Sequence, residues 1–148
     1  MKSSIRTFVL AAFAAAAILA TAHSATAQVF SSNASGDHQL GGGGTASVMV
    51  LALPYAGTYM LGGQQLVINE SQQPTEVVCW ISTTNGGAAS VPYGPISGMT
   101  AVAGAVITLP LGGSYTATGP TDLWAVCKNA TPGTVVLATN GNITAMYW

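Results

Sequence analysis

From residue 46 onward the chain alternates short apolar runs, rich in β-branched and aromatic residues, with clusters of Gly, Pro and Asn. Such spacing is typical of short antiparallel strands, and no segment after residue 27 has a helical period. The pattern predicts strands over residues 47–53, 57–69, 76–83, 101–109, 114–118, 122–128, 134–139 and 143–148. The expected fold class is therefore all-β, an antiparallel two-sheet sandwich or jelly roll of about 8–10 strands.

Strand parity separates the cysteines from the tryptophans. If Cys79 and Cys127 face the core, then Trp80 and Trp124 point the other way, since side chains alternate along a strand. An antiparallel sandwich normally has a polar outer face, so an apolar outer face needs cover. Three explanations stay open: burial within the monomer, a subunit interface, or a stacking platform for sugar rings. The candidate interface or stacking residues are Trp80, Trp124, Val78, Val126 and Trp148.

The first 27 residues have the pattern of an export signal. Lys2 and Arg6 precede an apolar run over residues 8–20, and the small residues Ala25-Thr26-Ala27 follow. The run is too short for a membrane anchor, so cleavage before Gln28 is expected. This signal predicts bacterial export, either to the periplasm or out of the cell. No membrane span is expected to remain after cleavage.

Domain boundaries follow from the same pattern. Residues 28–46 are rich in glycine and serine and have no hydrophobic period, which predicts a flexible arm. Residues 47–148 are expected to form one β-sandwich domain, because their length suits a single hydrophobic core.

Charge is scarce after the signal, and this restricts the chemistry. Residues 28–148 contain Asp37, Glu70, Glu76, Asp122 and Lys128, a net charge of −3, with no arginine and only one histidine. One lysine cannot supply the phosphate contacts of a nucleic-acid-binding protein or a basic membrane patch. Titratable groups that could converge on a substrate or a metal are few. We therefore expect no enzyme activity, no catalytic residues, no metal and no cofactor.

Cys79 and Cys127 are the only cysteines. Export to an oxidising compartment favours a disulfide between them, and neither a CxxC motif nor a histidine cluster indicates thiol or metal chemistry. In the chain-entropy model a bridge closing a loop of this length stabilises the fold by about 4 kcal/mol. Four Asn-x-Ser/Thr triplets, at Asn33, Asn69, Asn129 and Asn142, match the acceptor motif for N-glycosylation. Because the export signal looks bacterial, we interpret them as chance matches in a chain rich in these residues.

The order of several short motifs resembles that of small secreted bacterial jelly-roll domains with the C1q and tumour necrosis factor-like fold. The motifs are GTY at 57–59, LVIN at 66–69, VVCWI at 77–81, VITL at 106–109, LWAVC at 123–127 and ITAMYW at 143–148. The resemblance implies a ten-stranded jelly roll, homotrimers packed through one sheet, and a binding or matrix role without catalysis. The chain departs from the collagen-bearing relatives in having no Gly-X-Y stalk.

These observations favour a non-enzymatic, secreted or cell-surface structural or adhesive module that self-associates through an apolar sheet face, as a homo-oligomer and by resemblance a trimer. An alternative is a carbohydrate-binding module that stacks exposed tryptophans on a polysaccharide or other surface ligand. A third hypothesis is a small outer-membrane β-barrel, although most expected strands are shorter than the ~10 residues that a spanning strand needs.

Overall fold

The computed structural model describes residues 27–34, 36–86 and 96–147, and these contain nine strands and no helix. No segment in these ranges forms a helix long and apolar enough to cross a membrane. The strands are β1 (Gln28–Ala34), β2 (His38–Gly41), β3 (Thr45–Leu53), β4 (Gly57–Asn69), β5 (Thr75–Ser82), β6 (Ser97–Ala101), β7 (Val106–Ala117), β8 (Thr121–Asn129) and β9 (Val135–Tyr147). The predicted signal peptide lies outside the described residues, apart from Ala27.

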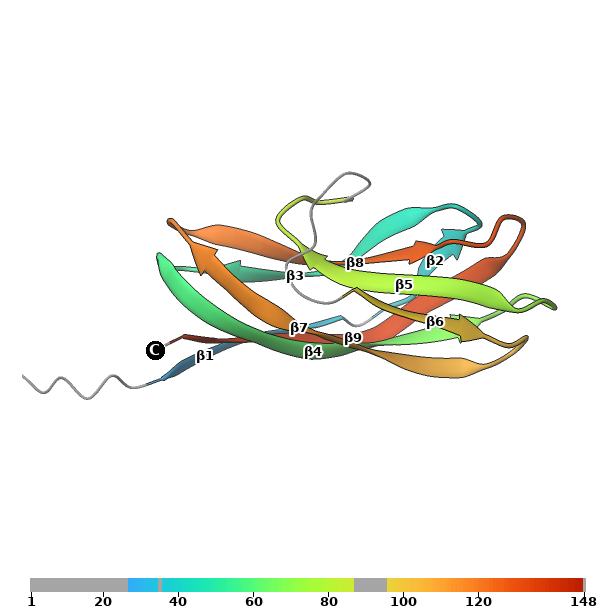
Figure 1. Cartoon of the computed structure of the whole chain (residues 1–148), viewed down its shortest axis with the longest axis horizontal. Helices are drawn as coiled ribbons and strands as arrows, with labels where there is room; N and C mark the ends of the chain where they lie inside the picture. The colour runs from blue at the N-terminus through green and yellow to red at the C-terminus, as the bar shows by residue number, and fades with distance from the viewer. Residues whose placement is uncertain (1–26, 35, 87–95, 148) are drawn as a thin grey trace, which may run out of the picture.

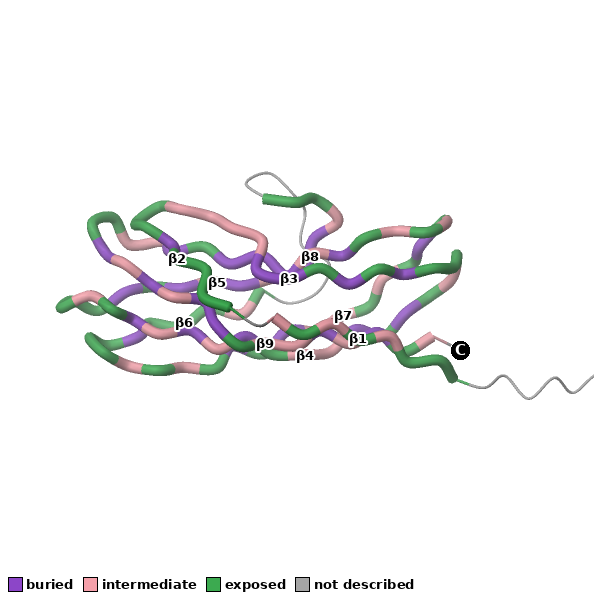
Figure 2. The backbone as a smooth tube through the Cα atoms, turned by 180° about the vertical axis from the view of Figure 1, so that it is seen from behind, coloured by how far each residue is buried: buried purple, intermediate pink, exposed green. Residues whose placement is uncertain are grey.

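The strands form two antiparallel sheets that face each other (Figure 1). Sheet A has the order β1-β9-β4-β7, with β2 also paired to β9, and sheet B has the order β3-β8-β5-β6. Buried and exposed residues alternate along most strands (Figure 2), as expected when one face of each sheet packs on the core. The predicted fold class, an all-β antiparallel sandwich, is confirmed.

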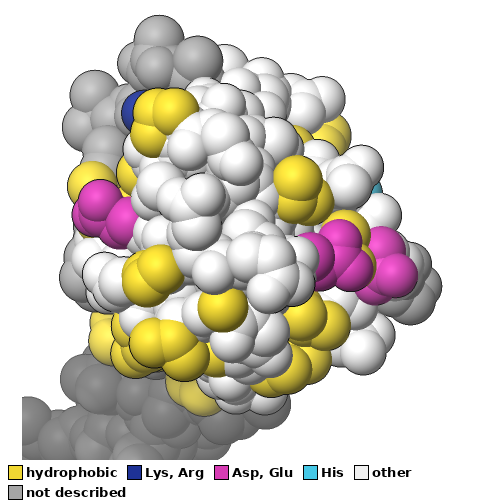
Figure 3. Space-filling view, turned by 90° about the vertical axis from the view of Figure 1, so that its right-hand side faces the viewer, with side chains coloured by type: hydrophobic (Ala, Val, Ile, Leu, Met, Phe, Trp, Pro, Cys, Tyr) yellow, Lys and Arg dark blue, Asp and Glu magenta, His cyan; other side chains and the backbone are white. Residues whose placement is uncertain are grey.

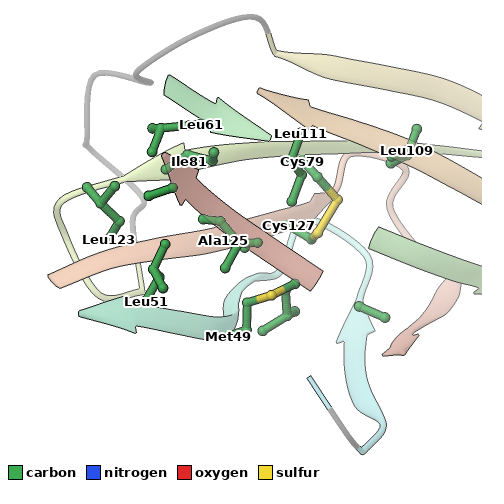
Figure 4. Packing of buried hydrophobic residues seen from close by; sticks show 14 of the residues in the cluster. Met49, Leu51, Leu61, Cys79, Ile81, Leu109, Leu111, Leu123, Ala125 and Cys127 are labelled. Carbon is green, nitrogen blue, oxygen red and sulfur yellow. A yellow bond between two sulfur atoms is a disulfide. The ribbon is translucent and has the colours of Figure 1, made fainter. Parts of the chain in front are cut away.

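The core fills the space between the sheets. Leu61, Leu109 and Leu111 from sheet A and Ile81 and Leu123 from sheet B belong to one buried cluster, in which Leu111 lies near the disulfide (Figure 4). The predicted Cys79–Cys127 bridge is confirmed. The two residues lie directly opposite each other on β5 and β8, with Cα atoms 4.2 Å apart and both side chains fully buried.

Residues 28–46 are not a flexible arm. They contain β1 and β2 and the first residues of β3, and both β1 and β2 pair antiparallel with β9. Phe30 and Ala34 pack against the core, and Leu40 is almost completely buried. The segment carries few apolar residues, so its strands are defined mainly by the backbone hydrogen bonds that the edge of β9 offers.

Two of the breaks expected between predicted strands lie inside long strands. Residues 111–113 are in the middle of β7, and residues 140–142 are in the middle of β9, so each pair of predicted strands is one strand. The glycine in β9 permits close approach, because a Cβ on Gly141 would lie 2.9 Å from the carbonyl oxygen of Gln64. Gly141 therefore marks close backbone contact between β9 and β4 rather than a chain reversal.

The strands β4 and β8 each end on a fully buried asparagine. The Oδ1 atom of Asn69 accepts a hydrogen bond from the backbone N–H of Ser71, and that of Asn129 accepts one from Thr131. Their Nδ2 atoms donate to carbonyl oxygens of neighbouring strands and loops. Two of the four Asn-x-Ser/Thr triplets therefore have a structural role that their interpretation as chance missed.

Candidate interaction surface

Strand parity correctly predicts the side of the sandwich on which the tryptophans lie. Trp80 pairs with Val126 and Trp124 with Ser82, all four on the outer face of sheet B, opposite the cysteine side. Val78 lies on the same face, next to Lys128. The remaining candidate, Trp148, lies outside the described residues. Four of the five candidate residues therefore share one surface.

This surface is partly covered by the chain itself. The backbone N–H of Gly86 donates to the Ser47 hydroxyl, 2.7 Å away on β3. The segment that follows β5 must therefore cross the outer face of β8, which lies between β5 and β3. Val126 is fully buried although it faces away from the core, and Trp80 and Trp124 are half-buried. Cover within the monomer thus accounts for part of the apolar outer face.

The indole Nε1 of Trp80 is buried and has no hydrogen-bond partner among the described residues. The edge of the ring therefore points into the protein rather than into water. The interface or stacking role of Trp80, Trp124 and Val78 stays a prediction.

Charged side chains also lie on the outer face of sheet B. Glu76, Asp122 and Lys128 are exposed there, at outward positions of β5 and β8. Packing a second protein against this face would remove water from them, which costs free energy unless each finds a partner.

Sheet A differs in that none of the strands β1, β4, β7 and β9 contains an Asp, Glu, Lys or Arg. Seen end-on, hydrophobic side chains gather along the lower edge of the molecule, the side on which sheet A lies, and acidic side chains lie higher (Figure 3). Three apolar residues form one row on the outer face of this sheet: Val29 lies opposite Met146, which lies opposite Met60. Their exposed fractions are 62%, 43% and 51%.

A hollow of about 230 Å³ lies beside this row, lined by Val29, Met60, Leu61, Gly62, Thr144 and Met146. Gly62 has no side chain, so the floor of the hollow is backbone between Met60 and its neighbours. We call the row and the hollow together the methionine face. The hydrophobic pattern does not predict this face, because residues 28–46 have no hydrophobic period and Val29 therefore falls in no expected strand. The alternation of Met60 and Met146 with buried neighbours was the available signal.

The remaining titratable residues do not gather into a site. Asp37 and His38 are exposed at the start of β2, and Glu70 is exposed in the turn after β4. Among the described residues, no three His, Cys, Asp or Glu side chains lie close enough to hold a metal ion.

No protein-family model and no curated protein matches the chain. Solved structures do share its fold. Eiger TNF from S. frugiperda aligns with a TM-score of 0.54 at 11% identity, covering 82% of this chain and 91% of that one. The globular domain of zebrafish complement 1qA aligns with a TM-score of 0.51 at 8% identity, covering 82% and 96%. The chain has the C1q/TNF-like jelly-roll fold.

The VP2 protein of an infectious bursal disease virus subviral particle also shares this jelly roll, with a TM-score of 0.57 at 13% identity. The alignment covers 83% of this chain and 33% of the viral protein, so the chain spans about a third of that protein's length. At these identities the likeness concerns the fold alone. The resemblance proposed from the sequence motifs is thereby confirmed at the level of the C1q/TNF-like jelly roll.

Proposed function

We propose that this chain is an exported, non-enzymatic structural or adhesive module that self-associates through the outer face of sheet A. The observation that carries the proposal is the composition of that sheet. Its strands β1, β4, β7 and β9 contain no charged residue, and the sheet presents the methionine face to solvent. Contiguous exposed apolar surface of this kind is typical of interaction sites.

The energetics favour an identical copy as the partner. Apolar surface contributes about 25 cal/mol per Å² when it is removed from water. Two copies of an uncharged face meet without like-charge repulsion and without desolvating an ion. The exposed side chains of Met60 and Met146 line the hollow on this face, which suits a surface that pairs with itself.

The interface expected from the sequence was the tryptophan face of sheet B, whereas this proposal places the interface on the outer face of sheet A. The apolar tryptophan face of sheet B carries Glu76, Asp122 and Lys128 and is crossed by the chain after β5, whereas the strands of sheet A contain no Asp, Glu, Lys or Arg. The C1q/TNF-like resemblance implies homotrimers packed through one sheet, and we propose that sheet A is that sheet. The polar loops at the two ends of the sandwich would then contact the surroundings.

Light scattering on the purified, disulfide-bonded chain tests the proposal. We expect a mass that is a small multiple of the protomer mass, a trimer if the resemblance extends to assembly. Met60→Lys should shift the mass to that of the protomer, because it places a charge in the centre of the interface. Ala52→Lys, at an exposed position on the outer face of sheet B, is the matched control and should not change the mass. A wild-type chain that stays a protomer at every concentration would contradict the proposal.

A carbohydrate-binding role is the second candidate, because Trp80 and Trp124 are diagonal neighbours that each keep part of their surface exposed. In this case acrylamide should quench tryptophan fluorescence in the assembled protein, and the chain should be retained on insoluble polysaccharide. Trp124→Ala should abolish that retention without changing the assembly mass. Retention that is unaffected by Trp124→Ala would remove this candidate.

A further inference from the structure

Two of the five methionines of the chain lie side by side on the outer face of sheet A. Met60 on β4 pairs directly with Met146 on β9, and both thioether side chains are about half exposed, at 51% and 43%. Val29 flanks Met146 on β1, and the backbone floor at Gly62 lies beside them. Two of the three side chains in this exposed apolar row are therefore thioethers.

A thioether is the one apolar side chain that a mild oxidant converts into a polar one. The sulfur lone pair attacks one oxygen of hydrogen peroxide, the O–O bond breaks, and the other oxygen leaves as water after a proton transfer. The sulfur loses two electrons to become a sulfoxide, and the peroxide gains them. Accessibility controls this reaction at each methionine, and exposed Met60 and Met146 meet that condition before assembly.

We propose that Met60 and Met146 are a sulfoxidation site, and that their oxidation by hydrogen peroxide dissociates the assembly; this inference rests on the proposed function. A sulfoxide oxygen is a strong hydrogen-bond acceptor. Among Val29, Leu61, Gly62 and Thr144, which line the hollow with the two methionines, only the Thr144 side chain carries a donor. Ser114, which lies opposite Met60 on β7, carries another.

The Thr144 hydroxyl is already engaged, since its Oγ1 donates to the carbonyl oxygen of Gly62 at 3.0 Å. The Ser114 hydroxyl has one hydrogen to donate, so burial of two sulfoxides per protomer against a second apolar face leaves at least one acceptor without a donor. We expect the dissociation constant of the assembly to rise at least tenfold.

The chain contains its own controls. Met99, on β6 of the other sheet, is 48% exposed and stays outside the proposed interface, so it should oxidise at least as fast as Met60 and Met146 without affecting assembly. Met49 is 7% exposed in the core, so it should stay reduced while the fold is intact. Met→Leu substitutions conserve volume and remove the reactive sulfur, which makes Met60→Leu combined with Met146→Leu the matched resistant variant.

The experiment treats the purified full-length protein with increasing hydrogen peroxide, maps each sulfoxide by peptide mass spectrometry, and follows mass by light scattering. Wild type and Met99→Leu should dissociate as Met60 and Met146 become oxidised, and methionine sulfoxide reductase should restore the assembly. The Met60→Leu/Met146→Leu protein should stay assembled under the same treatment.

The outcomes separate this inference from the proposal on which it rests. An assembly that survives full oxidation of Met60 and Met146, or a resistant variant that dissociates like wild type, would overturn the sulfoxidation inference alone. An untreated chain that is a protomer at every concentration would overturn both the inference and the proposed self-association.

Discussion

Replacement of Asn129 by alanine should lower the free energy of unfolding more than the replacement of an exposed asparagine by alanine. The fully buried Asn129 side chain links the end of β8 to β2 and to the turn between β8 and β9. Its Nδ2 donates to the carbonyl oxygens of Leu40 at 3.2 Å and Thr134 at 3.1 Å, and its Oδ1 accepts from the N–H of Thr131 at 3.1 Å. The same amide therefore ties β2, the β8–β9 turn and the end of β8 together.

The magnitude follows from the groups left without partners. Asn129→Ala leaves the carbonyl oxygens of Leu40 and Thr134 and the N–H of Thr131 unpaired, at about 1 kcal/mol each. We expect the free energy of unfolding to fall by ~3 kcal/mol, which is a large part of the ~5–15 kcal/mol typical of a domain. The melting temperature should fall by about 10 °C.

Urea denaturation followed by tryptophan fluorescence and far-UV circular dichroism measures this loss. Asn33→Ala, at an exposed position of β1, is the matched control and should change the free energy by less than ~0.5 kcal/mol. Asn129→Asp keeps the shape but removes the donor, so it should be at least as destabilising at pH 7 and less so at pH 3, where the carboxyl is protonated and donates again. A loss below ~1 kcal/mol for Asn129→Ala would refute the proposed role.

Two further perturbations address the disulfide and the glycines of sheet A. Replacing both Cys79 and Cys127 by alanine should lower the free energy of unfolding by up to ~4 kcal/mol, measured by thermal unfolding, and a reducing agent should then have no further effect on the variant. Gly141→Ala should be strongly destabilising, because its Cβ would lie 2.9 Å from the carbonyl oxygen of Gln64. Gly41→Ala, where a Cβ meets nothing within 4 Å, should be nearly neutral in the same assay, and equal losses in the two variants would contradict the close-approach argument.

Part of the candidate surface was within reach of the sequence. The alternation that places Cys79 in the core also places Trp80 outside it, and the structure confirms both positions. The methionine face was not predictable in the same way. Met60 and Met146 are 86 positions apart in the sequence numbering and become neighbours only because β9 pairs with β4, which no local pattern encodes.

The amino-acid sequence by itself determined the class of fold, the disulfide and the near absence of charge, because hydrophobic alternation, cysteine count and composition are local or additive properties of the chain. Tertiary structure alone decided that residues 28–34 and 38–41 are strands, since β1 and β2 hold few apolar residues and depend on the edge of β9. It also decided which sheet is free of charge on its outer face, because strands that alternate along the chain are sorted into two separate sheets.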